Sequence, residues 1–316
     1  MAEIGTDINK AKEILEKGGL VAIPTETVYG LAANAFNNHA VARIFEAKNR
    51  PSFDPLIVHI PDVDSLNQVS REVPANSQVL IDKFWPGPLS IILPKANQIS
   101  DLVTSGLDTV AIRMPKHKMT RKLLQSLSFP LVAPSANPFG YVSPTSAKHV
   151  NDQLADKVDY ILDGGSCKIG LESTIIEFNE SSFPKVLRLG GLEIEEIEKV
   201  IGKIDVANHS SSNPKAPGML ANHYSPSKPI ILGNIDKLVK KHIGKRYGVL
   251  SYTKKYDGSC NFVLSQCGSV IEAATNLFKG LRYMDKLDID IILTEKVPAE
   301  GVGKAINDRL MRASVH

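Results

Sequence analysis

GLVAIPTETVYGLAANAFNNHAVARIFEAKNRPSFDPLIVH, residues 19–59, is the segment around which the chain is organised. Its apolar run at 20–23 predicts a buried strand, which Pro24 ends because proline cannot donate a ladder hydrogen bond. Polar side chains follow in the loop: Thr25, Glu26, Thr27 and Tyr29. Gly30 then permits a close backbone approach. Such a loop is typical of a binding site, but a hydrophilic sheet tip fits these residues equally well.

The second half of this segment places cations at a helix exit. Residues 38–48 predict a helix that ends before Pro51, since a proline disfavours helical geometry in the preceding residue. Lys48 and Arg50 suit a polyphosphate or a carboxylate, and the extended stretch up to His59 adds a further titratable group. The alternative is a helix C-terminus stabilised by basic residues, which contributes about 0.3–1 kcal/mol.

Length and composition limit the function classes. The 316 residues are enough for two domains, and the apolar and charged fractions of 43% and 22% are ordinary for a globular protein. The net charge of +3 does not indicate a strongly basic nucleic-acid-binding surface. Cys167, Cys260 and Cys267 lack C-x-x-C spacing, so neither a disulfide framework nor a structural zinc site is predicted.

The N-terminal residues 1–19 have the pattern of an amphipathic helix that stops at Gly18, and they show no signal peptide. No apolar run approaches the roughly 20 residues of a membrane span. We therefore expect a soluble, cytoplasmic protein without membrane contact.

The pattern of a buried strand followed by polar residues recurs along the first 200 residues. The strand at 109–113 ends in Arg113, and the strand at 131–134 leads to three polar residues, Ser135, Asn137 and Ser143. Glu172 and Ser173 precede another apolar run, and a further strand carries Arg188. Hydroxyls and amides on tight turns can bind phosphate or ribose. Equally, these arginines could pair with carboxylates, and Ser-x-Asn-Pro is also ordinary turn chemistry.

Residues 203–228 are rich in Ser, Pro and Asn and predict a linker between a domain at 1–202 and a domain at 229–316. His223 and Tyr224 are unusual in a passive tether, so the linker could act as a lid over a ligand. From residue 229 onward, strands alternate with helices, which predicts a small open α/β domain with a parallel sheet. Neither Ser nor Thr follows Lys304 in the run 301–304, so this run predicts a helix start, not a phosphate loop.

Seven motifs together resemble the Sua5/YrdC family in its two-domain Sua5 form. They are IPTETVYGL at 23–31, KNRP at 48–51, PLIVH at 55–59, PSAN at 134–137, ESTI at 172–175, PGM…HYSP at 217–226 and AINDRL at 305–310. The resemblance implies an N-terminal YrdC-like domain with a twisted mixed α/β sheet. It also implies a smaller C-terminal Rossmann-like domain with an open parallel α/β sheet.

The resemblance further implies an activity. The family comprises nucleotidyltransferases that make L-threonylcarbamoyladenylate from L-threonine, bicarbonate and ATP with Mg²⁺, releasing pyrophosphate. The product passes to the tRNA threonylcarbamoyl transferase machinery for N6-threonylcarbamoyladenosine formation in tRNAs that read ANN codons, and a direct tRNA contact is possible. Chemistry of this kind depends on positioned cations and needs no covalent nucleophile.

Site roles also follow from the resemblance. It implies that L-threonine binds to Thr27, His59, Arg113, Ala133 and Ser173. It implies that ATP binds to Lys48, Arg50, Asp54, Thr109, Ser135, Asn137, Ser143, Arg188 and Tyr224. No side chain is assigned to the metal, which ATP would carry. The family's linker commonly has Lys-Tyr-Arg where this chain has Leu220, Ala221 and Asn222, so a basic phosphate contact from the linker is in question.

Two other functions compete with this one. An RNA-binding module would use the same cations for backbone phosphates, but aromatic stacking residues are few here. A carbamoyl-adenylating enzyme of hydrogenase maturation carries a related domain, but that class resembles a larger protein with zinc-binding cysteine pairs.

Overall fold

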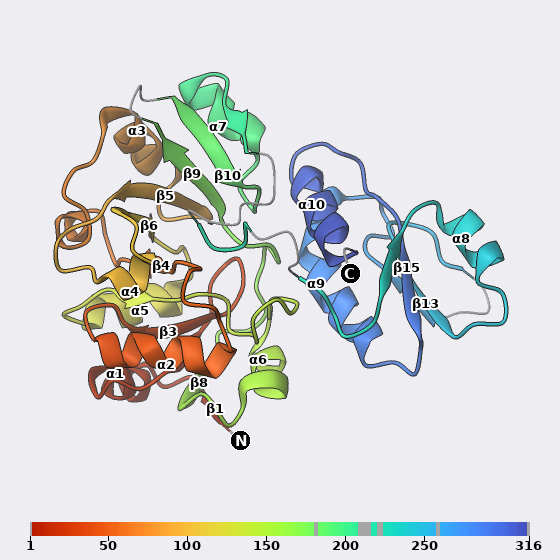
Figure 1. Cartoon of the computed structure of the whole chain (residues 1–316), viewed down its shortest axis with the longest axis horizontal. Coiled ribbons are helices and arrows are strands. Elements are labelled where there is room, and N and C mark those ends of the chain that lie inside the picture. Colours follow the sequence, from red (N-terminus) through yellow and green to blue (C-terminus); the bar gives the residue numbers. More distant parts are fainter. Residues whose placement is uncertain (1, 180–182, 208–215, 220–223, 257–259, 315–316) are drawn as a thin grey trace.

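The computed structural model describes residues 2–179, 183–207, 216–219, 224–256 and 260–314, and Figure 1 shows them as two α/β domains. The elements of the first domain are β1 (Glu3–Gly5), α1 (Ile8–Glu16), β2 (Val21–Ile23), β3 (Gly30–Asn34), α2 (Asn38–Lys48), β4 (Ile57–His59), the 3-10 helix η1 (Asp64–Gln68), α3 (Ala75–Phe84), β5 (Leu89–Pro94), α4 (Asp101–Thr104), β6 (Thr109–Arg113), α5 (Lys118–Ser126), β7 (Leu131–Val132), α6 (Ala147–Leu154), β8 (Tyr160–Leu162), β9 (Thr174–Phe178), β10 (Pro184–Arg188), α7 (Ile194–Ile201) and β11 (Asp205–Val206). Those of the second are β12 (Ile230–Leu232), α8 (Ile235–Lys241), β13 (Tyr247–Ser251), β14 (Cys260–Val263), α9 (Val270–Asp285), β15 (Ile291–Thr294) and α10 (Gly303–Ala313).

The first domain is built on one mixed sheet in the order β1-β8-β2-β3-β7-β4-β6-β5-β9-β10-β11. Strand β2 shows why helices cover both faces. Val21 and Ile23 pack in a cluster with residues of α1 and α5, whereas Leu20 and Ala22 pack in another with residues of α2. This alternation is the period of two that places successive side chains on opposite faces of a sheet.

The register of the mixed sheet aligns one residue from each of five strands in a row, and four of the five are polar. His59 of β4 is the partner of Arg113 of β6, which is in turn the partner of Ser90 of β5. Ser90 is paired with Ile175 of β9, and Ile175 with Arg188 of β10. Because paired residues of neighbouring strands face the same side of a sheet, this register brings together groups that lie far apart in sequence.

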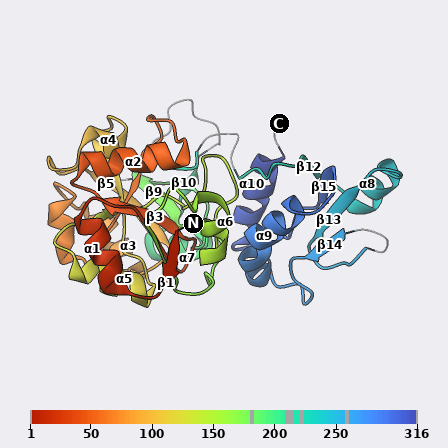
Figure 2. The same ribbon diagram turned by 90° about the horizontal axis from the view of Figure 1, so that it is seen from below.

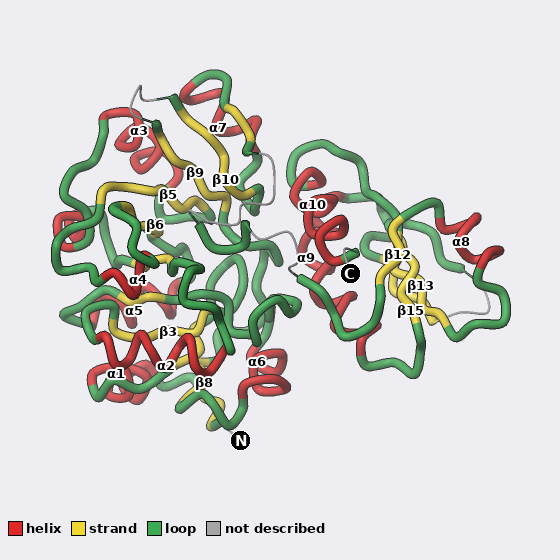
Figure 3. Tube along the Cα trace, in the orientation of Figure 1, coloured by secondary structure: helices red, strands yellow, loops and turns green. Residues whose placement is uncertain are grey.

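The second domain has the parallel sheet that its sequence pattern predicts, in the order β12-β15-β13-β14. Figures 1 and 2 both place α9 and α10 between this sheet and the first domain. Figure 3 shows the strands of this sheet on the side of these two helices that faces away from the first domain. The second domain therefore meets the first through helices. The predicted fold class, a mixed α/β sheet domain followed by a smaller parallel one, is confirmed.

Three segments differ from the sequence-based expectation. Residues 1–19 do not form one helix: Glu3–Gly5 is the edge strand β1, which pairs with β8, and Asp7 caps a helix that starts at Ile8. Strand β3 was not predicted, because its small residues lack an alternating pattern. Strand β11 lies inside the predicted linker and extends the first sheet by pairing with β10. In that pairing β10 supplies hydrogen-bond partners for the backbone of β11. Local composition does not reveal a partner that comes from another strand.

Candidate active site

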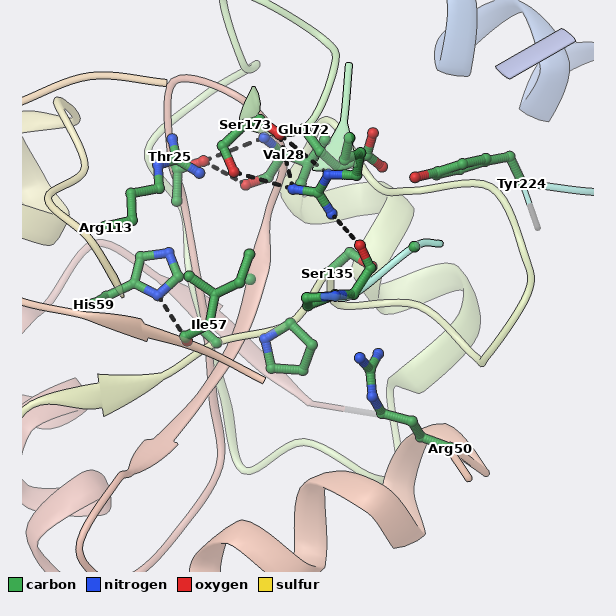
Figure 4. Close-up of a pocket in the computed structure, with 16 residues that line it drawn as sticks. Thr25, Val28, Arg50, Ile57, His59, Arg113, Ser135, Glu172, Ser173 and Tyr224 are labelled. Carbon is green, nitrogen blue, oxygen red and sulfur yellow. Dashed lines mark hydrogen bonds between the residues drawn. The ribbon is translucent and has the colours of Figure 1, made fainter. Parts of the chain in front are cut away.

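A pocket lies where the strands of the first sheet end, and the segment between the domains contributes to its wall (Figure 4). Its lining residues are Thr25, Val28, Gly30, Arg50, Ile57, His59, Arg113, Ala133, Pro134, Ser135, Glu172, Ser173, Arg188, Pro217, Gly218 and Tyr224. Gly30 shows why the loop after β2 ends in glycine. A Cβ there would come within 3.1 Å of the Ala133 Cβ and would push β3 away from the turn after β7.

At one end of the pocket, Arg113 is held by three groups. Its Nη1 donates to Thr27 Oγ1 at 2.9 Å, its Nη2 to Glu26 Oε1 at 2.5 Å and its Nε to the Gly87 carbonyl at 3.2 Å. The loop after β2 thus orients the guanidinium at the end of β6. Sequence reasoning placed Glu26 in this loop but gave it no role.

His59 lies beside Arg113 and is neutral. Its Nδ1 is 3.2 Å from the Ile57 carbonyl. Burial, together with the charge of Arg113, lowers the pKa of His59 to about 3. The imidazole can therefore contribute a hydrogen bond at neutral pH without adding charge to this end of the pocket.

Arg188 connects the sheet to the segment between the domains. Its Nε and Nη2 donate to the Ser173 carbonyl at 3.1 and 2.9 Å, and its Nη2 also reaches Ser173 Oγ at 3.0 Å. Its Nη1 donates to the Pro217 carbonyl at 3.1 Å. Burial lowers the pKa of Arg188 to about 10, so it remains a cation at neutral pH.

The two motifs KNRP and PSAN meet in space. Lys48 Nζ donates to the carbonyl oxygens of Ser135, at 2.5 Å, and Asn137. Asn49, the C-cap of α2, has φ 50°, and this left-handed conformation turns the chain towards Arg50. The exit of α2 therefore braces the turn that follows β7.

Arg50 is fixed by the residues that follow it. Its Nε donates to the Asp54 carbonyl at 3.1 Å and its Nη2 to the Pro55 carbonyl at 2.8 Å, and Nη2 pairs with Asp54 Oδ2 at 2.9 Å. Burial raises the pKa of Asp54 although Arg50 and Lys48 act against it. Burial, reinforced by Arg50, moves the pKa of Lys48 well below its ordinary value. An anionic ligand in the pocket would offset the charge of Arg50 and favour the protonated form of Lys48.

Glu172 is a pocket residue to which sequence reasoning assigned no role. Its Oε1 accepts from Ser143 Oγ at 2.5 Å, and its Oε2 pairs at 3.1 Å with Arg309 of α10 in the second domain. Although burial acts to raise it, the charges of Arg309 and Arg188 lower the pKa of Glu172. Glu172 belongs to the motif ESTI and Arg309 to the motif AINDRL. Membership in these motifs was the sequence signal that could have pointed to both residues.

The structure brings most predicted site residues together. Those that line the pocket are His59, Arg113, Ala133, Ser173, Arg50, Ser135, Arg188 and Tyr224. Those that lie behind the lining and contact it or its support are Thr27, Lys48, Asp54, Asn137 and Ser143. Thr109 is not brought to the pocket, because it begins β6 whereas Arg113 ends it, about 13 Å along the strand. His223 and residues 220–222 lie outside the described residues. The ligand roles themselves stay predictions.

The charge balance defines the class of site. Among the described lining residues, Arg50, Arg113 and Arg188 contribute three guanidinium groups, and Glu172 is the one carboxylate. Arginine forks suit carboxylate and phosphate groups. The fold and this pocket therefore define a two-domain α/β protein with an arginine-lined pocket, in which Glu26 and Asp54 pair with Arg113 and Arg50 from behind the lining.

Comparison with known families agrees with this class. A Sua5/YciO/YrdC family model, described as "Telomere recombination", matches residues 13–190. A second model, "Threonylcarbamoyl-AMP synthase, C-terminal domain", matches residues 192–315. The chain belongs to the Sua5/YrdC family, in its two-domain form.

Individual relatives match over nearly the whole chain. A threonylcarbamoyl-AMP synthase of Pyrococcus abyssi is 45% identical, with 97% of this chain and 94% of the relative covered. One of Bacillus subtilis is 41% identical, with 97% and 92% covered. The crystal structure of P. abyssi Sua5 complexed with L-threonine superposes with a TM-score of 0.94 at 42% identity and covers 100% of both chains.

None of the described helices is long and apolar enough to cross a membrane. The described part of the chain also contains no group of three or more His, Cys, Asp or Glu side chains placed to hold a metal ion.

Proposed function

We propose that this chain is an L-threonylcarbamoyladenylate synthase, a nucleotidyltransferase that uses L-threonine, bicarbonate and ATP and releases pyrophosphate. The observation that carries the proposal is the convergence of three buried arginines on one pocket in a chain with full-length threonylcarbamoyl-AMP synthase relatives. The structural relative with bound L-threonine supports the amino-acid substrate.

The Arg113 end of the pocket suits the threonine. A guanidinium held by Thr27 and Glu26 can receive the carboxylate as a planar fork. Neutral His59, the Ser173 hydroxyl and the Ala133 backbone would complete this subsite. Because His59 carries no charge, it does not repel the ammonium group that must lose a proton before it attacks bicarbonate.

The opposite end suits ATP. The threonine amine attacks bicarbonate, and water leaves. An oxygen of the resulting carbamate then attacks the α-phosphorus, and the bond to the β-phosphate oxygen breaks to release pyrophosphate. Arg50 and Arg188, supported by Lys48, would stabilise the negative charge on the phosphates, and Ser135, Asn137 and Ser143 would fix the nucleotide. No covalent intermediate with the protein is required.

The metal would arrive with the nucleotide. Mg²⁺ in such sites commonly keeps several waters and is held mainly by phosphate oxygens. The carboxylate of the described lining, Glu172, is engaged on both oxygens by Ser143 and Arg309, so the residues present offer it no open carboxylate ligand. We therefore assign Mg²⁺ to the ATP phosphates.

In this proposal the segment between the domains keeps water out of the pocket, because the carbamate is unstable in water. Pro217, Gly218 and Tyr224 already form part of the pocket wall, and the Tyr224 hydroxyl points towards the pocket in Figure 4. In our proposal Tyr224, held in this position, covers the nucleotide until adenylation is complete.

The product would pass to the tRNA threonylcarbamoyl transferase machinery for modification of tRNAs that read ANN codons. We place this activity in the cytoplasm, where tRNA is modified and thiols stay reduced, in keeping with the three unpaired thiols of Cys167, Cys260 and Cys267. Direct tRNA contact is a further possibility of this proposal.

The test is pyrophosphate release from Mg²⁺·ATP and bicarbonate, measured with and without L-threonine. We expect release only when both threonine and bicarbonate are present. No release, combined with tight RNA binding, would replace this function with an RNA-binding module.

A further inference from the structure

Arg309 brings a cation from the second domain to the pocket of the first. The residue is fully buried. Its Nε and Nη2 both donate to Glu172 Oε2 at 3.1 Å, and its Nη2 also donates to the Leu189 carbonyl at 2.7 Å. Its Nη1 pairs with Asp308 Oδ2 at 2.5 Å. A single guanidinium on α10 therefore holds the carboxylate that lines the pocket in the other domain.

The same guanidinium packs on Tyr224. Its Cζ lies 4.6 Å from the centre of the tyrosine ring, the Arg312 Cζ lies 5.0 Å from it, and the Phe278 ring stacks at 5.7 Å. Tyr224 has φ 68°, a conformation that bulky residues rarely adopt and that persists only where the surroundings enforce it. Residues of α9 and α10 therefore hold a strained tyrosine against the pocket.

The space beside Tyr224 leaves little room for a side chain at position 218. Gly218 has φ 76°, and a Cβ there would lie 2.9 Å from the Tyr224 hydroxyl oxygen and 3.3 Å from Arg188 Cδ. Any larger residue would displace one of these two lining groups. Gly218 therefore lies next to both Tyr224, which the second domain holds, and Arg188, which donates to Ser173 and Pro217.

Two other ion pairs between the domains differ from that of Arg309. Lys304, on the same helix, pairs with Glu195 at 2.5 Å, and Lys286 pairs with Asp152 at 2.5 Å. The lysine side chains are 38% and 60% exposed, and none of these four residues lines the pocket. They hold the domains together without entering the site.

We propose that Arg309 is a positioning residue of the active site, which fixes both Glu172 and Tyr224 so that the nucleotide half of the pocket is complete only when the second domain is docked. This inference rests on the proposed function for its ligand. One planar group stacks on the ring and binds the carboxylate at the same time. A lysine, as a point charge, cannot do both.

The first experiment compares Arg309→Lys with Lys304→Gln, a matched loss of an interdomain ion pair on α10. Isothermal titration measures the binding of Mg²⁺·ATP and of L-threonine, and pyrophosphate release measures turnover. We expect Arg309→Lys to weaken ATP binding and raise the KM for ATP about ten-fold or more, while threonine affinity stays within about three-fold. Lys304→Gln should match the wild type in both.

Two results would overturn the inference. Arg309→Lys could bind ATP as well as Lys304→Gln does. Alternatively, its affinities for ATP and threonine could fall together in proportion to a loss of folded protein, which would make its role only structural.

A second measurement does not depend on the proposed reaction. Melting temperatures of Arg309→Met, Tyr224→Leu and the double variant form a cycle, with Lys304→Gln and Tyr224→Leu as the control cycle. We expect non-additive shifts in the first cycle and additive shifts in the second. If the wild type makes no threonine-dependent pyrophosphate, the proposed function fails, while this cycle still tests the coupling. Additive shifts in the Arg309 cycle would refute it.

Discussion

The two domains use their strand ends in different ways. In the first domain, the ends of β4, β6 and β10 carry His59, Arg113 and Arg188 to a pocket. In the second domain, polar groups near the strand ends satisfy one another. The Tyr252 amide donates to Glu295 Oε1 at 3.0 Å, and Thr294 Oγ1 donates to the Leu250 carbonyl at 2.8 Å.

This difference separates fold from function. Ligands in open parallel α/β sheets commonly bind beyond the carboxyl ends of the strands. The second domain has that sheet, yet its connection to the site comes from the helices α9 and α10. The fold alone would have pointed to the wrong edge, because function resides in particular side chains and not in the architecture that carries them.

Arginine burial follows the same division. In the second domain, Arg282, Arg309 and Arg312 are buried. Arg282 donates to the Ser143 carbonyl at 3.2 Å and to Gln153 Oε1 at 2.8 Å in the first domain. By contrast, Arg246 pairs with aspartates while its side chain is 59% exposed. Buried arginines are costly unless their partners are fixed, so their positions mark the surface by which this domain acts.

Removal of the second domain should have the largest effect. A chain that ends at residue 216 keeps the mixed sheet but loses Tyr224, Arg309 and the wall at 217–218. We expect a cooperative thermal transition and a fall in threonine-dependent pyrophosphate release of about 100-fold or more, since both closure and positioning are lost. Circular dichroism checks the fold. Full activity of this truncated chain would show that the second domain has no part in the site.

Loss of the cations at the exit of α2 should come next. Arg50→Ala and Lys48→Ala should each lose roughly 1.5–3 kcal/mol of charge-assisted interaction, or about 10- to 100-fold in nucleotide turnover. Steady-state pyrophosphate release at saturating threonine measures this. Wild-type rates in both purified variants would remove these residues from the nucleotide site.

The neutral state of His59 predicts a pH dependence of stability. Its folded-state pKa of about 3 lies below its ordinary value of 6.5, so the unfolded chain binds more protons between these values, and stability falls as the pH drops through this window. His59 should account for roughly 2 kcal/mol of the loss in unfolding free energy between pH 7.5 and 5. Urea unfolding of wild type and His59→Asn at both pH values measures its share. An equal loss in both proteins would contradict a buried neutral imidazole.

The smallest effect should come from the exposed arginine of the second domain. Arg246→Ala removes pairs with Asp288 and Asp290 that are open to solvent, so screening leaves them little to contribute. We expect turnover, KM for ATP and melting temperature all within error of the wild type. A measurable change in the KM for ATP would show that the far side of this domain also reaches the site.

Local signals in the sequence determined much of this molecule. The helix α2 and the strand β6 begin and end where the sequence pattern predicts. The alternation of strands and helices after residue 229 predicts the second domain. The motifs identify the family. Each motif is a short run of residues whose conformation depends on close neighbours in the sequence, as in the turn from Asn49 to Arg50 at the end of α2.

Only the tertiary structure decided the register and the contacts between domains. The row from His59 to Arg188 depends on which strands pair, and no single segment encodes this pairing. The pair of Arg309 and Glu172 joins positions 137 residues apart. The same applies to Thr109, which shares a strand with Arg113 but ends up away from the pocket. Periodicity and capping act over a few residues, whereas burial of a charge depends on distant groups that meet only when the chain has folded.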